Sequence, residues 1–149
     1  MTTPRTTTDA NEWVTARAGP RTFRVDLAAR THALVADEPE ALGGTNAGPS
    51  PYELLLAALG SCTAITLRMY ADRKKWPLER VEVRVRQARP HEPDCENCST
   101  ATVGVVHIER EIDFIGPLTD EQKRRLTEIA DRCPVHQTLE RGIPVEARP

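Results

Sequence analysis

Residues 48–76 read GPSPYELLLAALGSCTAITLRMYADRKKW, and this stretch predicts the long helix around which the fold is built. Pro49 and Pro51 suit the start of a helix, because proline presets the backbone angle φ and needs no amide partner in the first turn. Between residues 52 and 67 the only charged side chain is Glu53. A helix that is apolar on all sides needs cover on all sides. We therefore expect a central, buried helix whose charged C-terminal end reaches solvent.

Cys62 lies midway along this predicted helix, directly after Gly60 and Ser61. Two small neighbours leave room above the sulfur for a ligand or for a neighbouring backbone. This room is the first indication of a functional site.

Length and charge limit the classes of protein that the chain can represent. Its 149 residues suit one domain, expected over residues 11–149 after a Thr-rich, disordered tail over residues 1–10. The net charge of −2 and the pI of about 6.1 provide no basic surface for nucleic acid or an anionic membrane. We therefore expect a small or neutral partner.

The sequence favours a cytoplasmic protein. The N-terminus lacks the apolar run of a signal peptide. Glu53, Gly60 and Ser61 interrupt the central helix, which we expect to be too short in apolar length to span a membrane. In the cytoplasm the four cysteines should be reduced thiols, available for metal or redox chemistry.

Alternating apolar and polar residues predict antiparallel strands on both sides of the central helix. Thr119 and Gln122 form a capping-box pattern that opens a second helix, and Pro134 should end or kink it. Leu126, Ile129, Ala130 and Cys133 share one stripe of that helix. The strands are expected over residues 12–18 and 21–28 (a hairpin), 32–36, 81–87, 102–113 with a bulge near Val105, and 143–147. This order predicts an α+β fold in which mainly antiparallel sheets wrap a long central helix.

Cys62 and Cys133 are the leading candidates for chemistry. Cys133 is followed by Pro134, which supplies no backbone donor, and by His136, which is close enough in a helical turn to meet the thiol. The alternative is that both cysteines are small buried residues that only fill space, because free cysteine is among the most buried residue types.

Cys95 and Cys98 form a separate pair with the spacing of a metal half-site, and His91 or His107 could add a nitrogen ligand. Zinc is the metal this pattern favours, although a complete set of four ligands is not visible. The pair could also be a redox dithiol or a reduced pair without function. No other cofactor is expected.

Two blocks of the sequence, GPSPYELLLAALGSCTAITLRMYA from residue 48 and ADRCPVHQTL from residue 130, resemble the OsmC/Ohr family of proteins induced by osmotic stress or organic hydroperoxides. In that family a cysteine in the central helix is combined with a Cys-Pro-Val near the C-terminus. The resemblance implies an intertwined homodimer, with each long helix backed by sheets from both chains and two sites at the interface.

The resemblance also implies thiol peroxidase activity on organic hydroperoxides. Cys62 falls on the attacking cysteine of the family and Cys133 on the resolving one, and an external thiol or dithiol would reduce the disulfide. The family places a carboxylate ten residues before the first cysteine; Tyr52 occupies that position here, and Glu53 follows it. The partner arginine of that carboxylate is expected to be Arg21, or else Arg17.

Further roles are expected from the residues themselves. His136 offers a polar partner for Cys133, and an apolar lining from Leu55, Leu59 and Ile65 would suit an alkyl or fatty-acyl tail. Two alternatives from other classes stay open. One is a noncatalytic module that binds a lipid-like ligand or senses redox state, with the thiols as a latch. The other is a Cys–His hydrolase that uses His136.

Overall fold

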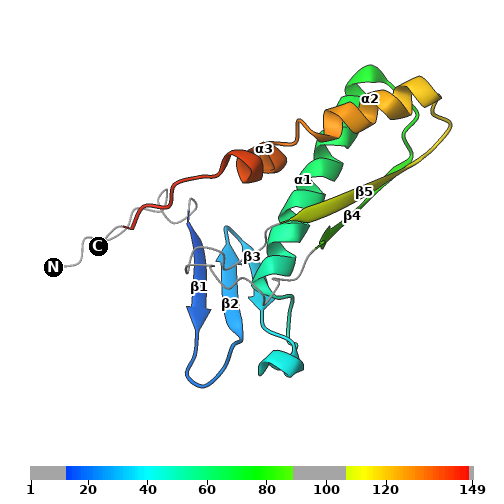
Figure 1. The fold of residues 1–149 in the computed structure, drawn as a ribbon. Helices are drawn as coiled ribbons and strands as arrows, with labels where there is room; N and C mark the ends of the chain where they lie inside the picture. Colours follow the sequence, from blue (N-terminus) through cyan, green and yellow to red (C-terminus); the bar gives the residue numbers. More distant parts are fainter. Residues whose placement is uncertain (1–12, 89–106, 148–149) are drawn as a thin grey trace, which may run out of the picture. The chain divides into compact units, whose positions relative to one another are not determined.

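The computed structural model describes residues 13–88 and 107–147. Figure 1 shows their helices and strands. The chain divides into two compact units, Met1–Leu54 and Leu55–Pro149, which are described one at a time. The predicted tail over residues 1–10 lies outside the described residues.

The N-terminal unit contains a three-stranded antiparallel sheet, in the order β1 (Val14–Ala18), β2 (Val25–Ala29) and β3 (His32–Ala36). Val14 of β1 pairs with Ala29, and Val25 pairs with Ala36 of β3. The predicted hairpin and third strand are confirmed, but the second strand of the hairpin begins at Val25 instead of residue 21. A short 3₁₀ helix, η2 (Glu40–Leu42), follows β3.

Asp37 fixes the loop between β3 and the long helix. Its side chain is buried and accepts hydrogen bonds from the amides of Glu38, Thr45 and Ala47 and from the Thr45 hydroxyl, at 2.6–3.1 Å. These bonds, led by that of the hydroxyl, stabilise the charged form and lower the pKa of Asp37 to about 2. Gly48 is required in this loop, since a Cβ there would lie 2.2 Å from the carbonyl oxygen of Val35.

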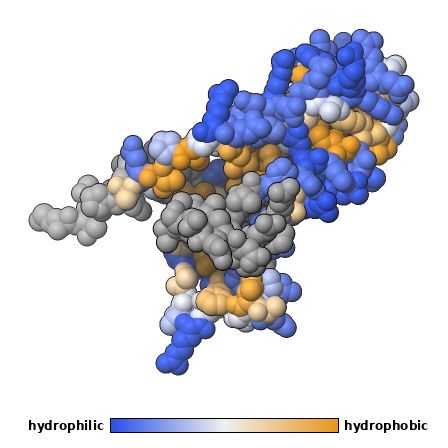
Figure 2. Space-filling model, viewed as in Figure 1, coloured by the Kyte–Doolittle hydropathy of each residue, from blue (hydrophilic) through white to orange (hydrophobic). Residues whose placement is uncertain are grey.

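The long helix α1 (Pro51–Lys74) begins at the predicted proline and continues into the C-terminal unit. Its first turn is closed by a capping box, in which the Ser50 amide donates to Glu53 Oε2 at 2.7 Å and the Glu53 amide donates to Ser50 Oγ at 3.3 Å. The burial of α1 is less complete than predicted. Ile65 and Met69 are 59% and 63% exposed, and Figure 2 shows apolar surface that remains uncovered on the C-terminal unit.

By length and composition α1 is able to cross a membrane, which corrects the expectation that its apolar length is too short. Its 24 residues contain an 18-residue window of mean hydropathy 1.5. The core helix of a folded domain meets the same criterion. Leu67 and Ala71 of α1 are fully buried in the core of the C-terminal unit, which agrees with that second interpretation.

The C-terminal unit pairs β4 (Arg80–Gln87) with β5 (Ile108–Ile115) in antiparallel register, with Val85 opposite Arg110. Burial alternates along both strands, as expected for a sheet with one wet face. Helix α2 (Asp120–Ala130) begins with the predicted capping box of Thr119 and Gln122. The core lies between α1, α2 and this sheet, and it contains Leu67, Ala71, Leu78, Leu118, Leu126, Ile129 and Ala130.

Three predicted boundaries change. β5 begins at Ile108 and runs to Ile115, two residues beyond the predicted end, while the predicted start at Thr102 and the bulge near Val105 lie outside the described residues. Residues 143–147 form no strand, and Val145 there is 91% exposed, so its apolar side chain packs against nothing within the described chain.

The third change concerns Cys133. Helix α2 ends at Ala130, and a separate helix, α3 (Pro134–Arg141), starts at the proline that was expected to end or kink α2. Cys133 therefore lies at the N-cap of α3 instead of on the last turn of α2. A proline at the first helical position is favourable, because its missing amide hydrogen is not needed there.

Candidate functional site

The structure brings Cys62 and Cys133 together within the C-terminal unit. Both are free thiols, and they lie close enough for each to shift the pKa of the other. Cys62 is partly exposed on α1, whereas Cys133 is fully buried. The tertiary structure therefore joins two cysteines that lie far apart in the sequence, in the pairing that the family resemblance implies.

Cys133 is the more acidic thiol of the pair. Burial, the largest single influence, raises its pKa, but several hydrogen bonds together outweigh burial and lower it. They come from the His136 amide, the Cys62 thiol, the Thr63 hydroxyl and the Val135 amide. The two amides belong to the first turn of α3, where unpaired N–H groups favour a negative charge.

Cys62 has the opposite shift. Burial raises the pKa of its thiol, and so does the hydrogen bond with Cys133, while the Val135 amide and the Thr66 hydroxyl act weakly in the other direction. Because the two thiols interact strongly, the first proton to leave belongs to the pair. The favoured singly ionised form has Cys62 S–H donating to a Cys133 thiolate.

Arg110 of β5 is a site residue that the sequence reasoning missed. Its side chain is only 14% exposed. Its Nη1 donates to Thr63 Oγ1 at 3.4 Å and to the Ala130 carbonyl at 3.2 Å, and its Nη2 pairs with Asp131 Oδ1 at 2.7 Å. Position 110 lies between Ile108 and Ile112 on the inward phase of the strand. A charged residue at such a position is the signal that could have identified it.

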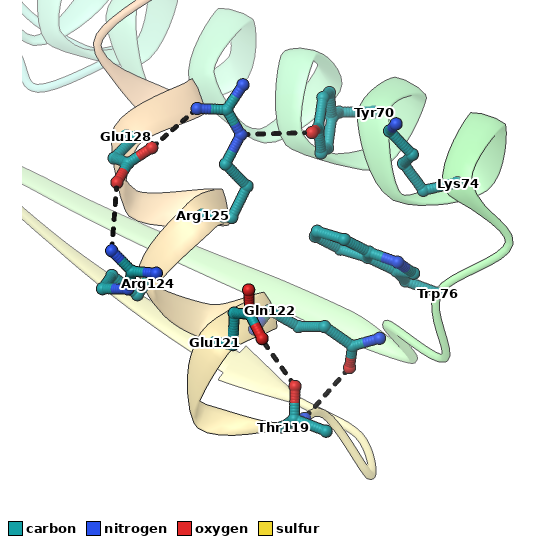
Figure 3. Close-up of a pocket in the computed structure, with 9 residues that line it drawn as sticks. All are labelled: Tyr70, Lys74, Trp76, Thr119, Glu121, Gln122, Arg124, Arg125 and Glu128. Carbon is teal, nitrogen blue, oxygen red and sulfur yellow. Dashed lines mark hydrogen bonds and ion pairs between the residues drawn. The ribbon is translucent and has the colours of Figure 1, made fainter.

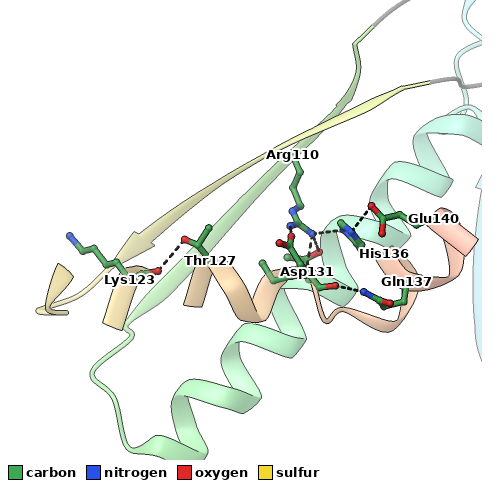
Figure 4. Close-up of polar contacts among 9 residues, drawn as sticks. Arg110, Lys123, Thr127, Asp131, His136, Gln137 and Glu140 are labelled. Atoms are coloured by element: carbon green, nitrogen blue, oxygen red, sulfur yellow. Dashed lines mark hydrogen bonds and ion pairs between the residues drawn. The ribbon is translucent and has the colours of Figure 1, made fainter. Parts of the chain in front are cut away.

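His136 lies in the same cluster, and both nitrogens of its ring are engaged by Arg110 and Glu140 (Figure 4). Nδ1 is 3.1 Å from Arg110 Nη1, and Nε2 is 3.2 Å from Glu140 Oε1. Since a guanidinium can only donate, Nδ1 must accept and the ring proton is assigned to Nε2. The predicted contact with Cys133 is made by the backbone amide of His136. This arrangement argues against a Cys–His hydrolase, because neither ring nitrogen is free to accept the thiol proton.

A cavity of about 180 Å³ adjoins the cluster. Leu59, Ile108 and Leu139 supply apolar walls, and Arg110 and His136 supply the polar part. Leu59 lies one turn before Cys62 on α1, which agrees with its predicted role in the lining, whereas Ile65 is mostly exposed. Gly60 faces β4, since a Cβ there would lie 3.4 Å from Val85 Cγ2, so a strand fills the room beside that glycine.

Arg17, Arg21 and Glu53 belong to the N-terminal unit, and their predicted roles toward the thiols stay predictions. Arg21 adopts a positive φ of 59° in the turn after β1. Glu53 is engaged in the capping box with Ser50, and Tyr52 beside it is exposed.

The predicted zinc ligands His91, Cys95 and Cys98 lie outside the described residues. The carbonyl of His107, the alternative nitrogen ligand, accepts the amide of Ala88 at 3.1 Å. Within residues 13–88 and 107–147, no three His, Cys, Asp or Glu side chains form a group suited to a metal ion.

A second, larger cavity of about 630 Å³ lies between α1 and α2 and is lined by none of the candidate residues (Figure 3). Tyr70 and Trp76 meet edge to face there, with ring centroids 5.5 Å apart. The Tyr70 hydroxyl accepts from Arg125 Nε at 3.3 Å, and this bond lowers the pKa of the phenol. The walls are mainly charged, so this cavity is a poorer match for an apolar ligand than the one beside the thiols.

Comparisons with known proteins agree with this architecture. A family model described as OsmC-like protein matches residues 44–148. An OsmC-like protein from Mycoplasma pneumoniae is 20% identical, with 85% of each chain covered and a TM-score of 0.71. A putative osmotic stress induced and detoxification response protein from Psychrobacter arcticus is 18% identical, over 84% of this chain and 85% of that chain, with a TM-score of 0.69.

An organic hydroperoxide resistance protein OsmC from Legionella pneumophila is 20% identical, over 85% of this chain and 88% of that chain, with a TM-score of 0.54. At these identities the likeness establishes the fold: an α+β structure with antiparallel sheets and a long helix. No match was found among curated proteins.

Proposed function

This chain belongs to the OsmC family, and from that premise we propose that it is a cysteine-based peroxidase that reduces organic hydroperoxides. Cys62 is the attacking thiol and Cys133 the resolving thiol. The observation that carries the proposal is that the fold brings these two thiols together, one partly exposed and the other buried, so that each shifts the pKa of the other. A further support is that some structures with this fold are those of organic hydroperoxide resistance proteins.

The exposure of the two sulfurs supports these roles. A hydroperoxide can reach Cys62, whereas Cys133 is fully buried. Transfer of the shared proton from Cys62 to Cys133 along their hydrogen bond produces the Cys62 thiolate. Cys133 can receive this proton because its lowered pKa leaves it ionised first; since Cys62 is the less acidic thiol, the transfer is uphill and the Cys62 thiolate is the minor, reactive form.

The cycle balances with these two groups and an external reductant. The Cys62 thiolate attacks the outer peroxide oxygen, the O–O bond breaks, and the alkoxide leaves and takes the proton held by Cys133. Cys62 is now a sulfenic acid and Cys133 a thiolate. Attack of Cys133 on the Cys62 sulfur forms the disulfide and releases hydroxide, which is protonated to water. A dithiol then reduces the disulfide and is itself oxidised.

The substrate class follows from the cavity. Its apolar walls suit an alkyl chain, and its polar wall is made by Arg110 and His136, which belong to the hydrogen-bond network beside the thiols. We also propose a homodimer, since Ile65 and Met69 leave an apolar strip of α1 exposed in a single chain.

A noncatalytic, redox-sensing or lipid-binding protein is the second candidate. It is favoured by the raised pKa of Cys62, because a thiol that stays protonated reacts slowly with peroxide. It is also favoured by Glu53, the nearest carboxylate to the family position, whose side chain already caps α1.

Stopped-flow oxidation by cumene hydroperoxide separates the two candidates. The reference is the Cys95→Ser/Cys98→Ser protein, in which only Cys62 and Cys133 can react. A peroxidase loses thiol far faster than free cysteine, and Cys62→Ser abolishes the reaction. In Cys133→Ser the first step survives and a sulfenic acid accumulates, which dimedone traps. A rate no higher than that of free cysteine would refute the peroxidase proposal and favour the noncatalytic function.

A further inference from the structure

Arg110 is the least expected residue of the C-terminal unit. It occupies an inward position of β5 between Ile108 and Ile112, although its guanidinium cannot lose its charge. Burial of such a group is costly unless acceptors surround it. Within the described chain four acceptors do so: Thr63 Oγ1, the Ala130 carbonyl, His136 Nδ1 and Asp131 Oδ1.

Three of these acceptors lie close to Cys133 in the sequence, two before it and one after it. Ala130 and Asp131 end α2, and His136 belongs to the first turn of α3. One guanidinium therefore ties together the two ends of the short segment that carries the thiol (Figure 4). Gln137 closes the same segment, since its Nε2 donates to the Asp131 carbonyl at 2.7 Å.

We propose that Arg110 is a positioning residue for the thiol pair: it holds the first turn of α3 so that the backbone amides of Val135 and His136 point at the sulfur of Cys133. It acts on the thiols through His136 and the α2–α3 junction, and this effect does not depend on its place in the wall of the cavity. This inference rests on the proposed function for its catalytic meaning, but its effect on thiol ionisation does not require peroxide.

The other groups that face Cys133 make the direction of the effect clear. Cys62 and Thr63 from α1 and the first turn of α3 act on the thiol itself. The charged groups of the surrounding network are Arg110 from β5, Asp131 from the end of α2, and His136 with its partner Glu140 from α3. Without Arg110, the Asp131 carboxylate loses its counter-charge near Cys133, and His136 loses the contact that orients it. Both changes disfavour the thiolate.

The test compares Arg110→Met and Arg110→Lys in the Cys95→Ser/Cys98→Ser protein. The control is Arg86→Met, which removes an exposed arginine of the neighbouring strand β4 whose carboxylate partner is Glu109, at 2.6 Å. Thiolate absorbance at 240 nm is followed against pH without peroxide, and thiol loss with cumene hydroperoxide is then measured over the same pH range. Circular dichroism checks folding.

We expect the first ionisation of the thiol pair to move up by about one pH unit in Arg110→Met and by less in Arg110→Lys, with no shift in Arg86→Met. The peroxide rate should fall about tenfold below the ionisation and approach the reference rate above it.

Three results would overturn the proposal. One is a folded Arg110 variant with the titration of the reference. The others are a rate that falls equally at all pH values and loss of the fold in both variants, since Arg110 would then be only structural. If the titration shifts while the reference protein itself shows no peroxidase activity, the proposed function fails and the positioning role stands.

Discussion

Replacing Thr63 by valine tests the hydrogen bonding on which the acidity of Cys133 depends. Thr63 is fully buried, its oxygen accepts from Arg110, and its hydroxyl hydrogen is thereby left to donate to Cys133. Valine keeps the shape of the side chain and removes this donor together with the acceptor for Arg110, whose 3.4 Å contact is the longest of its four. The substitution therefore changes one bond to the sulfur without opening a cavity.

The expected magnitude follows from the number of donors that remain. A hydrogen bond to a charged group contributes about 1.5–3 kcal/mol, and one pKa unit corresponds to about 1.4 kcal/mol. Because the amides of Val135 and His136 still donate to the thiolate, we take the lower end of that range. We expect the pKa of the thiol pair to rise by about one unit.

Stability should change little. The Nη1 group of Arg110 keeps the Ala130 carbonyl and His136 Nδ1 as acceptors, so no charge is left unpaired. We expect a loss of at most about 1 kcal/mol in the free energy of unfolding.

Thiolate absorbance against pH measures the shift, again in the Cys95→Ser/Cys98→Ser protein. The matched control is Thr127→Val, which removes an exposed threonine hydroxyl of α2 that donates to the Lys123 carbonyl at 3.0 Å. A folded Thr63→Val protein with an unchanged titration curve would refute the account of Cys133 acidity given above.

Three other predictions concern the core, the N-terminal loop and the thiols. Leu126→Ala should lower the free energy of unfolding in urea by about 3 kcal/mol, because Leu126 of α2 is fully buried in the core of the C-terminal unit. A decrease below about 1 kcal/mol would contradict this packing. The pKa of Asp37 is lower in the folded than in the unfolded protein, so the ionised carboxylate stabilises the fold above about pH 4 and this effect is lost as the pH falls toward 2. The Asp37→Asn protein should therefore be less stable than the wild type at pH 7 and lose less stability on acidification. Thermal unfolding at several pH values measures both differences. Mild oxidation should link Cys62 to Cys133, and peptide mapping that finds Cys95 joined to either one would contradict the observed contact.

Patterns of short range determined the elements and many of their boundaries. Pro51 at the start of α1, the capping box of Thr119 and Gln122, and the alternating valines of β4 each depend on neighbours a few residues away. The motif around Cys62 and the Cys-Pro-Val at Cys133 indicated the family for the same reason.

Two predictions from these short-range patterns were wrong, because each depended on contacts that such patterns do not contain. Residues 143–147 alternate like a strand, but alternation cannot say whether a partner strand or a core is present to receive them, and the described chain provides neither. Cys133 looked like the last turn of one helix, because the stripe of apolar residues does not reveal that the chain turns at Asp131 and starts again at Pro134.

Only the tertiary structure decided the chemistry of the site. The sequence placed both cysteines but not their ionisation, which depends on the amides at the start of α3 and on burial by other elements. The family resemblance indicated an arginine near the N-terminus, and no sequence pattern indicated Arg110, whose partners come from α1, α2 and α3. Hydrogen bonds between distant segments leave no periodic mark in a sequence. Local motifs therefore predicted the thiol pair, while the hydrogen-bond network that determines its ionisation forms only when the chain is folded.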